Sequence, residues 1–292
     1  MKFSCSLPLP TIDQPLAVSE MNYEDFITLQ KFIQNGDPNL LELHLDKLID
    51  KYVDLKGHTL SALEKLIVIT YLRTISKGGE LKLSLKENEI ARFSLTDFLN
   101  TVMVNEDLFK RQKVSGNTAS LKWVALLGPP QQFAFKNVFD YMYSCLHYVT
   151  VGETLVTFSK LSVPEQNKML ERLPATITQQ LEVYSKQFEF AVNQIPVNLP
   201  VQALTGNQTS LVLSAKNGIL LELLKIFVGT SLNNIQEVNY VLVSKANYSM
   251  QDLYMMTPGE VDVAVGLLEA ELKEKAAQSA TQGGPSIAST VG

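Results

Sequence analysis

The residues best able to carry chemistry in this 292-residue chain are its three histidines, His44, His58 and His147, and its two cysteines. No histidine lies three or four residues from another histidine or a cysteine, so no helix would present two metal ligands on one face. The closest pair is Cys145 and His147. On a helix their side chains would point about 160° apart, since each residue turns the helix by about 100°. We expect a buried thiol beside a surface histidine there, with no metal site and no cofactor.

Motifs for phosphate binding or covalent catalysis do not occur in the sequence. The pair Gly78-Gly79 lacks the Lys and Ser/Thr of a phosphate-binding loop and precedes an expected strand. There is no nucleophile-elbow pentapeptide. Paired carboxylates such as Glu269 and Glu271 are typical of a solvated helix face. We therefore expect a protein that is not an enzyme. The alternative is a dispersed site, in which a histidine meets a Ser, Cys or carboxylate only in the folded chain.

The composition is that of a folded protein with an acidic surface. Hydrophobic residues make up 46% and charged residues 19%, and the formal net charge is -5 with a pI near 5.4. This charge disfavours nucleic acid, which is bound mainly by Lys and Arg against phosphates. The tightest basic cluster, residues 110–113, is typical of a solvated loop. Two cysteines fit a reducing compartment, and no apolar run approaches the roughly 20 residues of a membrane span. We expect a cytoplasmic protein at synthesis.

The sequence divides into four parts. Residues 1–20 hold three prolines and predict an extended arm, which either lies over its own domain or reaches a partner. Residues 21–196 predict an N-terminal helical part with a small sheet. Residues 197–276 predict a C-terminal helical block, whose segment Ile219–Val228 is too apolar to lie on a surface alone. Residues 277–292 are rich in Ala, Ser, Thr, Gly and Gln and predict a disordered tail.

Capping residues, first-turn prolines and apolar residues at the helical period mark the helices. Asn22 predicts a cap for the first helix, and Gly36 predicts its end. Ser162 and Glu165 predict a capping box. The expected helices cover residues 23–35, 38–53, 59–77, 95–102, 163–173, 176–194, 219–228, 232–245 and 255–275.

A change to a period of two predicts strands. Residues 80–86, 90–93 and 121–127 read as one small antiparallel sheet of about three strands, residues 110–120 as a polar loop, and residues 209–213 as a further strand. Residues 133–150 read as an aromatic helix with Phe135, Phe139 and Tyr143 on one core face. The expected fold is mainly α with a small antiparallel β-sheet (α+β), its helical subdomains packed around the buried C-terminal block.

One segment of the C-terminal block is a candidate for partner binding. It comprises Leu253, Tyr254, Met255 and Met256, just before the capping box of the last helix. Two flexible thioethers there could form an adaptable contact surface. The alternative, which we favour, is that they fill an irregular gap between helices.

The sequence also resembles one known family. Three runs of the C-terminal block look like the end of the baseplate hub and hub-assembly proteins of T-even-like contractile-tailed phages: residues 232–242, 248–253 and 256–260. Two upstream features are similar to the same family. They are residues 161–165 followed by Leu173-Pro174, and the helix 63–72 with Arg73, Gly78-Gly79 and the strand carrying leucines 81, 83 and 85.

This resemblance implies a non-enzymatic protein of the baseplate hub, either a component or an assembly factor. Its expected partners are other hub or tape-measure proteins, bound through apolar helix faces and strand edges. It would lie in the host cytoplasm during assembly and in the virion if it is structural. Two other readings stay open. One is a helical adaptor or chaperone unrelated to phages, and the other is an enzyme with an unrecognised site.

Overall fold

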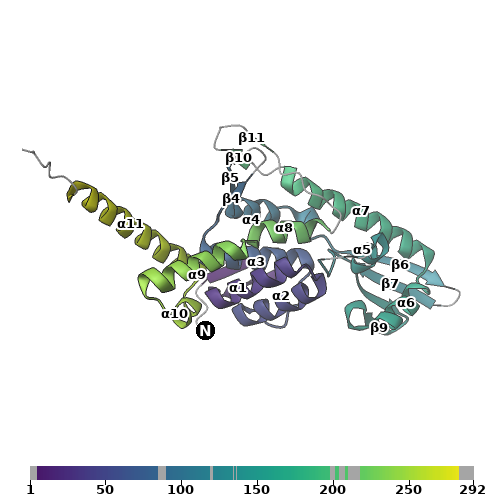
Figure 1. Cartoon of the computed structure of the whole chain (residues 1–292). Coiled ribbons are helices and arrows are strands. Elements are labelled where there is room, and N and C mark those ends of the chain that lie inside the picture. Colours follow the sequence, from purple (N-terminus) through teal and green to yellow (C-terminus); the bar gives the residue numbers. More distant parts are fainter. Residues whose placement is uncertain are drawn as a thin grey trace, which may run out of the picture.

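The computed structural model describes residues 5–84, 90–118, 121–133, 135, 137–197, 201–203, 208–209 and 218–282. Helices α1 to α3 form the centre of the molecule, a sheet covered by α7 lies at one side, and α11 projects from the other (Figure 1). The helices are α1 Tyr23–Asn35, α2 Pro38–Tyr52, α3 Ala62–Lys77, α4 Leu95–Met103, α5 Val138–Ser144, α6 Val163–Leu170, α7 Ala175–Val197, α8 Ile219–Val228, α9 Leu232–Ala246, α10 Met250–Met255 and α11 Pro258–Gln282.

The strands of the described residues form three antiparallel sheets, ordered β1-β2-β3, β11-β10-β5-β4 and β6-β7-β8-β9. The fold is mainly α with small antiparallel sheets, as the sequence predicts. The strands are β1 Cys5–Leu9, β2 Ile12–Val18, β3 Val53–Asp54, β4 Glu80–Ser84, β5 Ile90–Ser94, β6 Gln112–Thr118, β7 Leu121–Leu127, β8 Leu146–Val151, β9 Thr154–Thr157, β10 Val201–Ala203 and β11 Gln208–Thr209.

Helices α1, α2, α6 and α8 begin where the sequence predicts them, whereas α3 begins at Ala62 instead of residue 59 and α11 at Pro258 instead of residue 255. The side chain of Asn22 accepts a hydrogen bond from the backbone N–H of Asp25, and Gly36 ends α1 in the left-handed conformation that glycine adopts without strain. The capping box of Ser162 and Glu165 is present at the start of α6. The helix expected at residues 219–228 is α8, with the same bounds. These signals are local, so tertiary structure does not displace them.

The prediction of an extended arm for residues 1–20 is wrong for residues 5–18, which form two strands. β1 and β2 pair as an antiparallel hairpin, and β2 continues the sheet by pairing with β3. Leu7, Leu9, Leu16 and Val18 are buried, so the hairpin contributes to the core. The pairing shifts register between Leu7 and Leu9, where a proline lies, and prolines are tolerated at such irregularities.

The sheets also differ from the single sheet expected. β4 and β5 pair with each other as predicted, but β7 belongs to a different sheet, between β6 and β8. The polar loop expected at residues 110–120 is wrong, because β6 pairs with β7 from Gln112 to Thr118. β6 is polar because it is an edge strand with most of its side chains exposed. Of the strand expected at residues 209–213, only Thr209 lies within the described residues, at the end of β11, so the rest of this prediction is untested.

The aromatic helix expected at residues 133–150 is mostly wrong. Among the described residues of this range only α5 is helical, and the chain then enters strand β8. Phe135 precedes the helix, and its ring meets that of Tyr141 edge-on at 5.0 Å. Phe139 is 66% exposed and stacks on Tyr143 at the surface. Because the helix is so short, the i, i+4 spacing does not place these rings on one core face.

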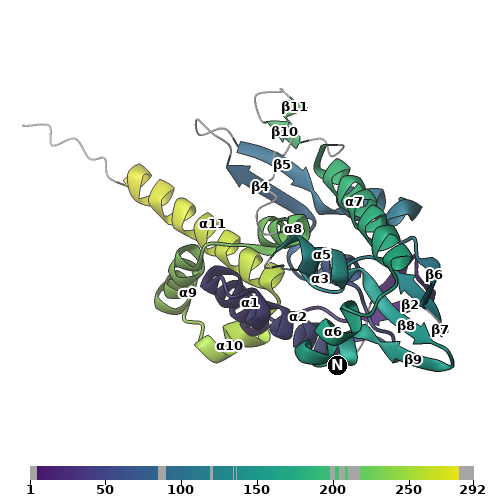
Figure 2. The same cartoon turned by 90° about the vertical axis from the view of Figure 1, so that its right-hand side faces the viewer.

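The C-terminal block packs on the N-terminal helices as part of one hydrophobic core. α8 is its buried element and lies against α3, and α9 and α10 lie against α1 (Figure 2). The division near residue 197 into two parts stays a prediction. The tail expected to be disordered from residue 277 is helical as far as Gln282, and residues 283–292 lie outside the described residues.

Candidate partner-binding surface

The C-terminal block is fixed to the body by α8. Leu223, Leu224 and Phe227 on this helix are fully buried. The ring of Phe227 stacks on Phe93 at 5.3 Å and meets the edge of Phe98 at 4.4 Å. Aromatic pairs at such distances add specific attraction to the burial of their apolar surface. The elements after α8 are therefore held by a rigid core contact.

The four predicted partner-binding residues lie at different depths. Leu253 is fully buried, so it is a core residue and does not face a partner. Tyr254 and Met256 are half-buried, whereas Met255 is 82% exposed. The carbonyl oxygen of Met256 accepts a hydrogen bond from the backbone N–H of Tyr23 at 2.7 Å. The segment thus divides into a buried anchor and one exposed thioether.

The sequence signal that could have predicted these different depths is the capping box at the start of α10. The Ser249 hydroxyl accepts a hydrogen bond from the backbone N–H of Asp252, and the carboxylate of Asp252 accepts from the Ser249 backbone N–H and hydroxyl. A helix that starts at Met250 turns Leu253 inward and Met255 outward. The sequence contains this box, but the prediction began its last helix at Met255.

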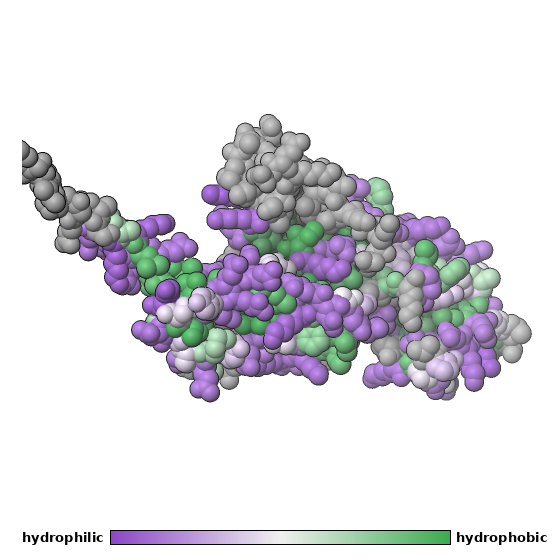
Figure 3. All heavy atoms as spheres, viewed as in Figure 1, coloured by the Kyte–Doolittle hydropathy of each residue, from purple (hydrophilic) through white to green (hydrophobic). Residues whose placement is uncertain are grey.

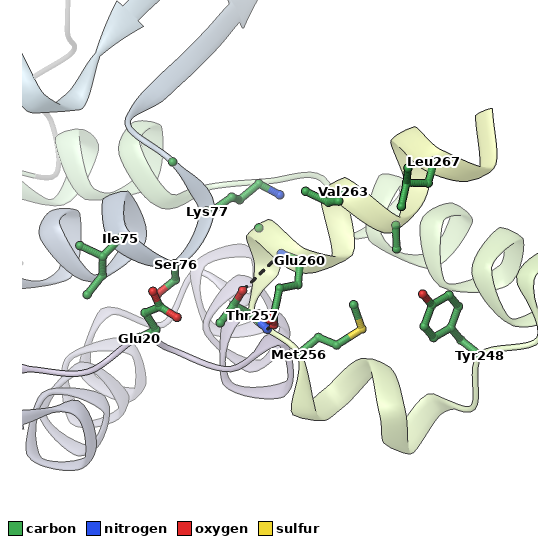
Figure 4. A pocket seen from close by; sticks show the side chains of 13 residues that line it. Glu20, Ile75, Ser76, Lys77, Tyr248, Met256, Thr257, Glu260, Val263 and Leu267 are labelled. Atoms are coloured by element: carbon green, nitrogen blue, oxygen red, sulfur yellow. Dashed lines mark hydrogen bonds between the residues drawn. The ribbon is translucent and has the colours of Figure 1, made fainter. Parts of the chain in front are cut away.

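A groove of about 710 Å³ lies between the end of α3 and the start of α11, and we name it the C-terminal groove. Figure 4 shows Ile75 at one end and Tyr248 at the other, with Met256 and the first turns of α11 between them. The lining residues are Glu20, Ile75, Ser76, Lys77, Gly78, Tyr248, Met256, Thr257, Gly259, Glu260, Val263, Ala264 and Leu267. Of the predicted residues, only Met256 lines the groove.

Local contacts set the direction of α11. The backbone N–H of Thr257 donates to the Glu260 carboxylate at 2.7 Å, and the N–H of Glu260 donates to the Thr257 hydroxyl at 3.2 Å. This is the capping box that the sequence predicts. A Cβ on Gly259 would lie 2.9 Å from the carbonyl oxygen of Ser76, so glycine permits the close approach of α11 to α3. These contacts orient α11 so that it extends from the body along the groove.

The apolar side chains of this surface continue outside the groove. Val263 and Leu267 on α11 are 63% and 68% exposed. Hydrophobic residues follow α11 away from the body in Figure 3. Exposed apolar side chains in a row on one projecting helix make this face a candidate contact surface.

Comparison with known families identifies the chain. The model of the family described as T4 bacteriophage base plate protein matches residues 8–215, more than two thirds of the sequence. The chain belongs to this family. It is therefore a T4-like phage baseplate protein, as its resemblance to that group of tail proteins predicts. Neither the curated proteins nor the solved structures contain a significant match.

Membership of this family removes the alternative of a helical adaptor unrelated to phages. The match runs from β1 to the segment before α8. The baseplate protein thus carries the C-terminal groove at the junction of the matched region and the block that follows it. Among the helices of the described residues, none has the length and apolar character needed to cross a membrane.

The positive groups near the groove of the baseplate protein have internal partners. Lys77 lies 3.3 Å from the Asp262 carboxylate, and its ammonium group lies 5.1 Å from the ring centre of Phe26. Burial lowers the pKa of Arg73 to about 10, and Asp262 opposes this shift. Glu20 and Glu260 are exposed at the rim. The exposed rim of the groove is therefore acidic.

The histidines and the buried cysteine of the baseplate protein lie in different environments. Cys145 is fully buried, as predicted, and burial raises its pKa to about 12, which makes the thiol a poor nucleophile. His147 is half-buried, which corrects the surface position expected, and its Nε2 lies 2.8 Å from the Pro129 carbonyl oxygen. His44 stacks on Phe32, and His58 is exposed. Across the described ranges, no group of His, Cys, Asp and Glu is placed to hold a metal ion.

Proposed function

We infer that this baseplate protein is a non-enzymatic component or assembly factor of the central hub and acts by protein–protein recognition. Its family places it among baseplate proteins. The observation that carries the finer proposal is α11, a helix that leaves the body with Val263 and Leu267 exposed beside the C-terminal groove. Such a helix has a second apolar face that the described residues leave exposed, and a partner protein could cover it.

The sequence resemblance supports the hub in particular. The segments that resemble hub proteins form α9, α10 and the start of α11, and Tyr248 and Met256 from these segments line the groove. The proposed partners are other hub or tape-measure proteins. The protein would meet them in the host cytoplasm during assembly, and a structural subunit would remain in the virion.

Quantitative mass spectrometry tests this proposal. Purified virions and lysate from the same infection are compared, together with isolated hub complexes and isolated outer baseplate sectors. A hub subunit appears in virions at a fixed ratio to the other hub proteins and is enriched in the hub complexes. An assembly factor is abundant in the lysate and in hub intermediates but absent from the virions. Recovery only with the outer sectors, or as a monomer free of tail proteins, would overturn the hub proposal.

A further inference from the structure

α11 has two apolar faces. The first comprises Val261, Ala264 and Leu268, which are at most 7% exposed and pack on the body. The second comprises Val263 and Leu267. With about 100° of rotation per residue, the second face lies roughly 110° round the helix from the first. A helix that is apolar on two faces is typical of one packed between neighbours on both sides, and here α1, α3 and α9 of the body cover the first face but leave the second exposed.

The C-terminal groove lies beside the second face. Ile75 at the end of α3, Tyr248 and Met256 provide apolar atoms along it. A rod lying against Val263 and Leu267 would therefore also contact the groove. Two positions four residues apart form one ridge of a helix, and such ridges pack into the grooves of another helix. The shape fits an α-helix.

The charges around the groove indicate which charged residues a bound helix would need. Residues 218–282 hold eight carboxylates and four lysines, a net charge of -4 out of -5 for the whole chain. On the helical period, the second face of α11 begins at Glu260 and ends at Glu274, and Glu20 lies on the facing rim. Lys77, the lysine that lines the groove, is paired with Asp262. A partner needs positive groups at both ends of its apolar stripe.

We propose that the C-terminal groove and the second face of α11 bind an amphipathic α-helix of another tail protein, with Lys or Arg flanking its apolar stripe. The proposal rests on the proposed function for the source of the partner. The distance from Glu260 to Glu274 corresponds to about 21 Å of helix, or four turns. A second copy of this chain is disfavoured, because it would bring two acidic blocks together.

A peptide assay tests the chemistry of the occupant. The probe is a fluorescent helical peptide of about four turns, with leucines at i, i+3 and i+7 and lysines at both ends. A matched peptide carries glutamates in place of the lysines. The full-length protein should bind the basic peptide at least tenfold more tightly than the acidic one. Equal affinity for the two peptides would overturn the proposed charge complementarity.

Two variants locate the binding. Leu267→Glu should weaken binding of the basic peptide at least tenfold, and so should the double variant Glu20→Lys, Glu274→Lys. Leu155→Glu is the matched control, because Leu155 on β9 is 62% exposed and far from α11. It should bind as the wild type does. If Leu267→Glu also keeps wild-type affinity, the peptide lies elsewhere and the proposal fails.

Cross-linking during infection identifies the natural occupant. A photoreactive amino acid at position 267 should link to a basic amphipathic helix of another tail protein. A link to a second copy of this chain, to an extended segment or to an acidic helix would overturn the proposal. The hub proposal is judged separately, by the protein's recovery with hub complexes, and would stand even if this groove proved to bind something else.

Discussion

Gln30 on α1 and Val228 at the end of α8 are joined through a fully buried side-chain amide. The Gln30 Nε2 donates to the Val228 carbonyl oxygen at 2.8 Å, and the Gln30 Oε1 accepts from the backbone N–H of Thr230 at 2.7 Å. One amide thus satisfies a donor and an acceptor that the end of α8 leaves without helical partners. This contact ties the family-matched body to the C-terminal block.

Replacing Gln30 should destabilise the whole molecule. Gln30→Leu keeps the size of the side chain but leaves two backbone groups unpaired, which costs about 2–4 kcal/mol. The free energy of unfolding in urea measures this loss. Gln34→Ala is the control, since Gln34 is exposed and bonds the Thr230 carbonyl oxygen at 3.1 Å. Its cost should stay below about 1 kcal/mol, within the range of a single hydrogen bond. Similar losses for both variants would contradict the role assigned to the buried amide.

The two serine caps Ser61 and Ser249 should differ in their effect on stability. Ser61 begins α3 and is 3% exposed, and its hydroxyl donates to Glu64, which also accepts from the Thr11 hydroxyl of the N-terminal hairpin. Ser61→Ala should cost about 2 kcal/mol, the upper end of the range for caps. Ser249→Ala, at the exposed cap of α10, should cost about 0.5–1 kcal/mol. Urea unfolding of both variants makes the comparison, and the reverse order would be evidence against the buried link.

Replacement by alanine should lower the stability of the protein at Gly116 and raise that of the helix at Gly266. A Cβ on Gly116 in β6 would lie 2.5 Å from the Thr176 hydroxyl and 2.8 Å from Pro174, so Gly116→Ala should destabilise by about 1–3 kcal/mol. A Cβ on Gly266 in α11 meets nothing within 4 Å, and Gly266→Ala should stabilise the helix by about 0.5–1 kcal/mol. Thermal unfolding measures the first effect, and helical circular dichroism during heating measures the second. A neutral Gly116→Ala would mean that β6 and α7 can separate slightly.

Stability should fall as the pH drops below about 6.5, the ordinary pKa of histidine. Burial lowers the pKa of His147 in the folded protein, and the Pro129 carbonyl opposes that shift. The unfolded chain therefore takes up a proton at a pH where the folded protein does not. The stabilisation is complete above about 6.5 and is lost as the pH falls towards the folded pKa.

Unfolding in urea between pH 7.5 and 5 measures this slope. His147→Gln keeps a donor for the Pro129 carbonyl and should flatten the slope, whereas the control His58→Gln, at an exposed position, should not. His44 acts in the same direction as His147, because burial also lowers its pKa. Burial raises the pKa of Glu42, so this carboxyl opposes them at lower pH. A slope unchanged by His147→Gln would contradict the assignment.

Much of the helical part could be predicted because its signals are local. The apolar positions Ile177, Leu181, Tyr184, Phe188 and Val192 are all buried along α7, as the helical period predicts. The N-terminal hairpin was missed because three prolines outweighed its alternating leucines. β6 was missed because an edge strand with a polar outer face has the composition of a loop.

The candidate surface could be located only coarsely. The sequence selects residues 253–256, but their depth depends on the short helix α10 and on the hydrogen bond between Tyr23 and Met256. The sequence predicts only a helix over residues 255–275, and its apolar residues do not separate the exposed Val263 and Leu267 from the buried Val261 and Leu268. Their exposure depends on where the body ends beneath α11, and no local pattern contains that information.

The burial of Phe227 has a consequence during translation. Phe93 and Phe98 leave the ribosome long before the ring that packs on them, and chains fold from the N-terminus as they are made. Until α8 has been synthesised, these aromatic rings and the apolar face of α3 that contacts it lack their cover. A nascent chain is thus exposed to aggregation or to chaperones, and a truncated message gives an incomplete core. The C-terminal groove is lined by residues up to Leu267, so a chain that stops before this residue lacks both the full core and the complete surface proposed to bind a partner.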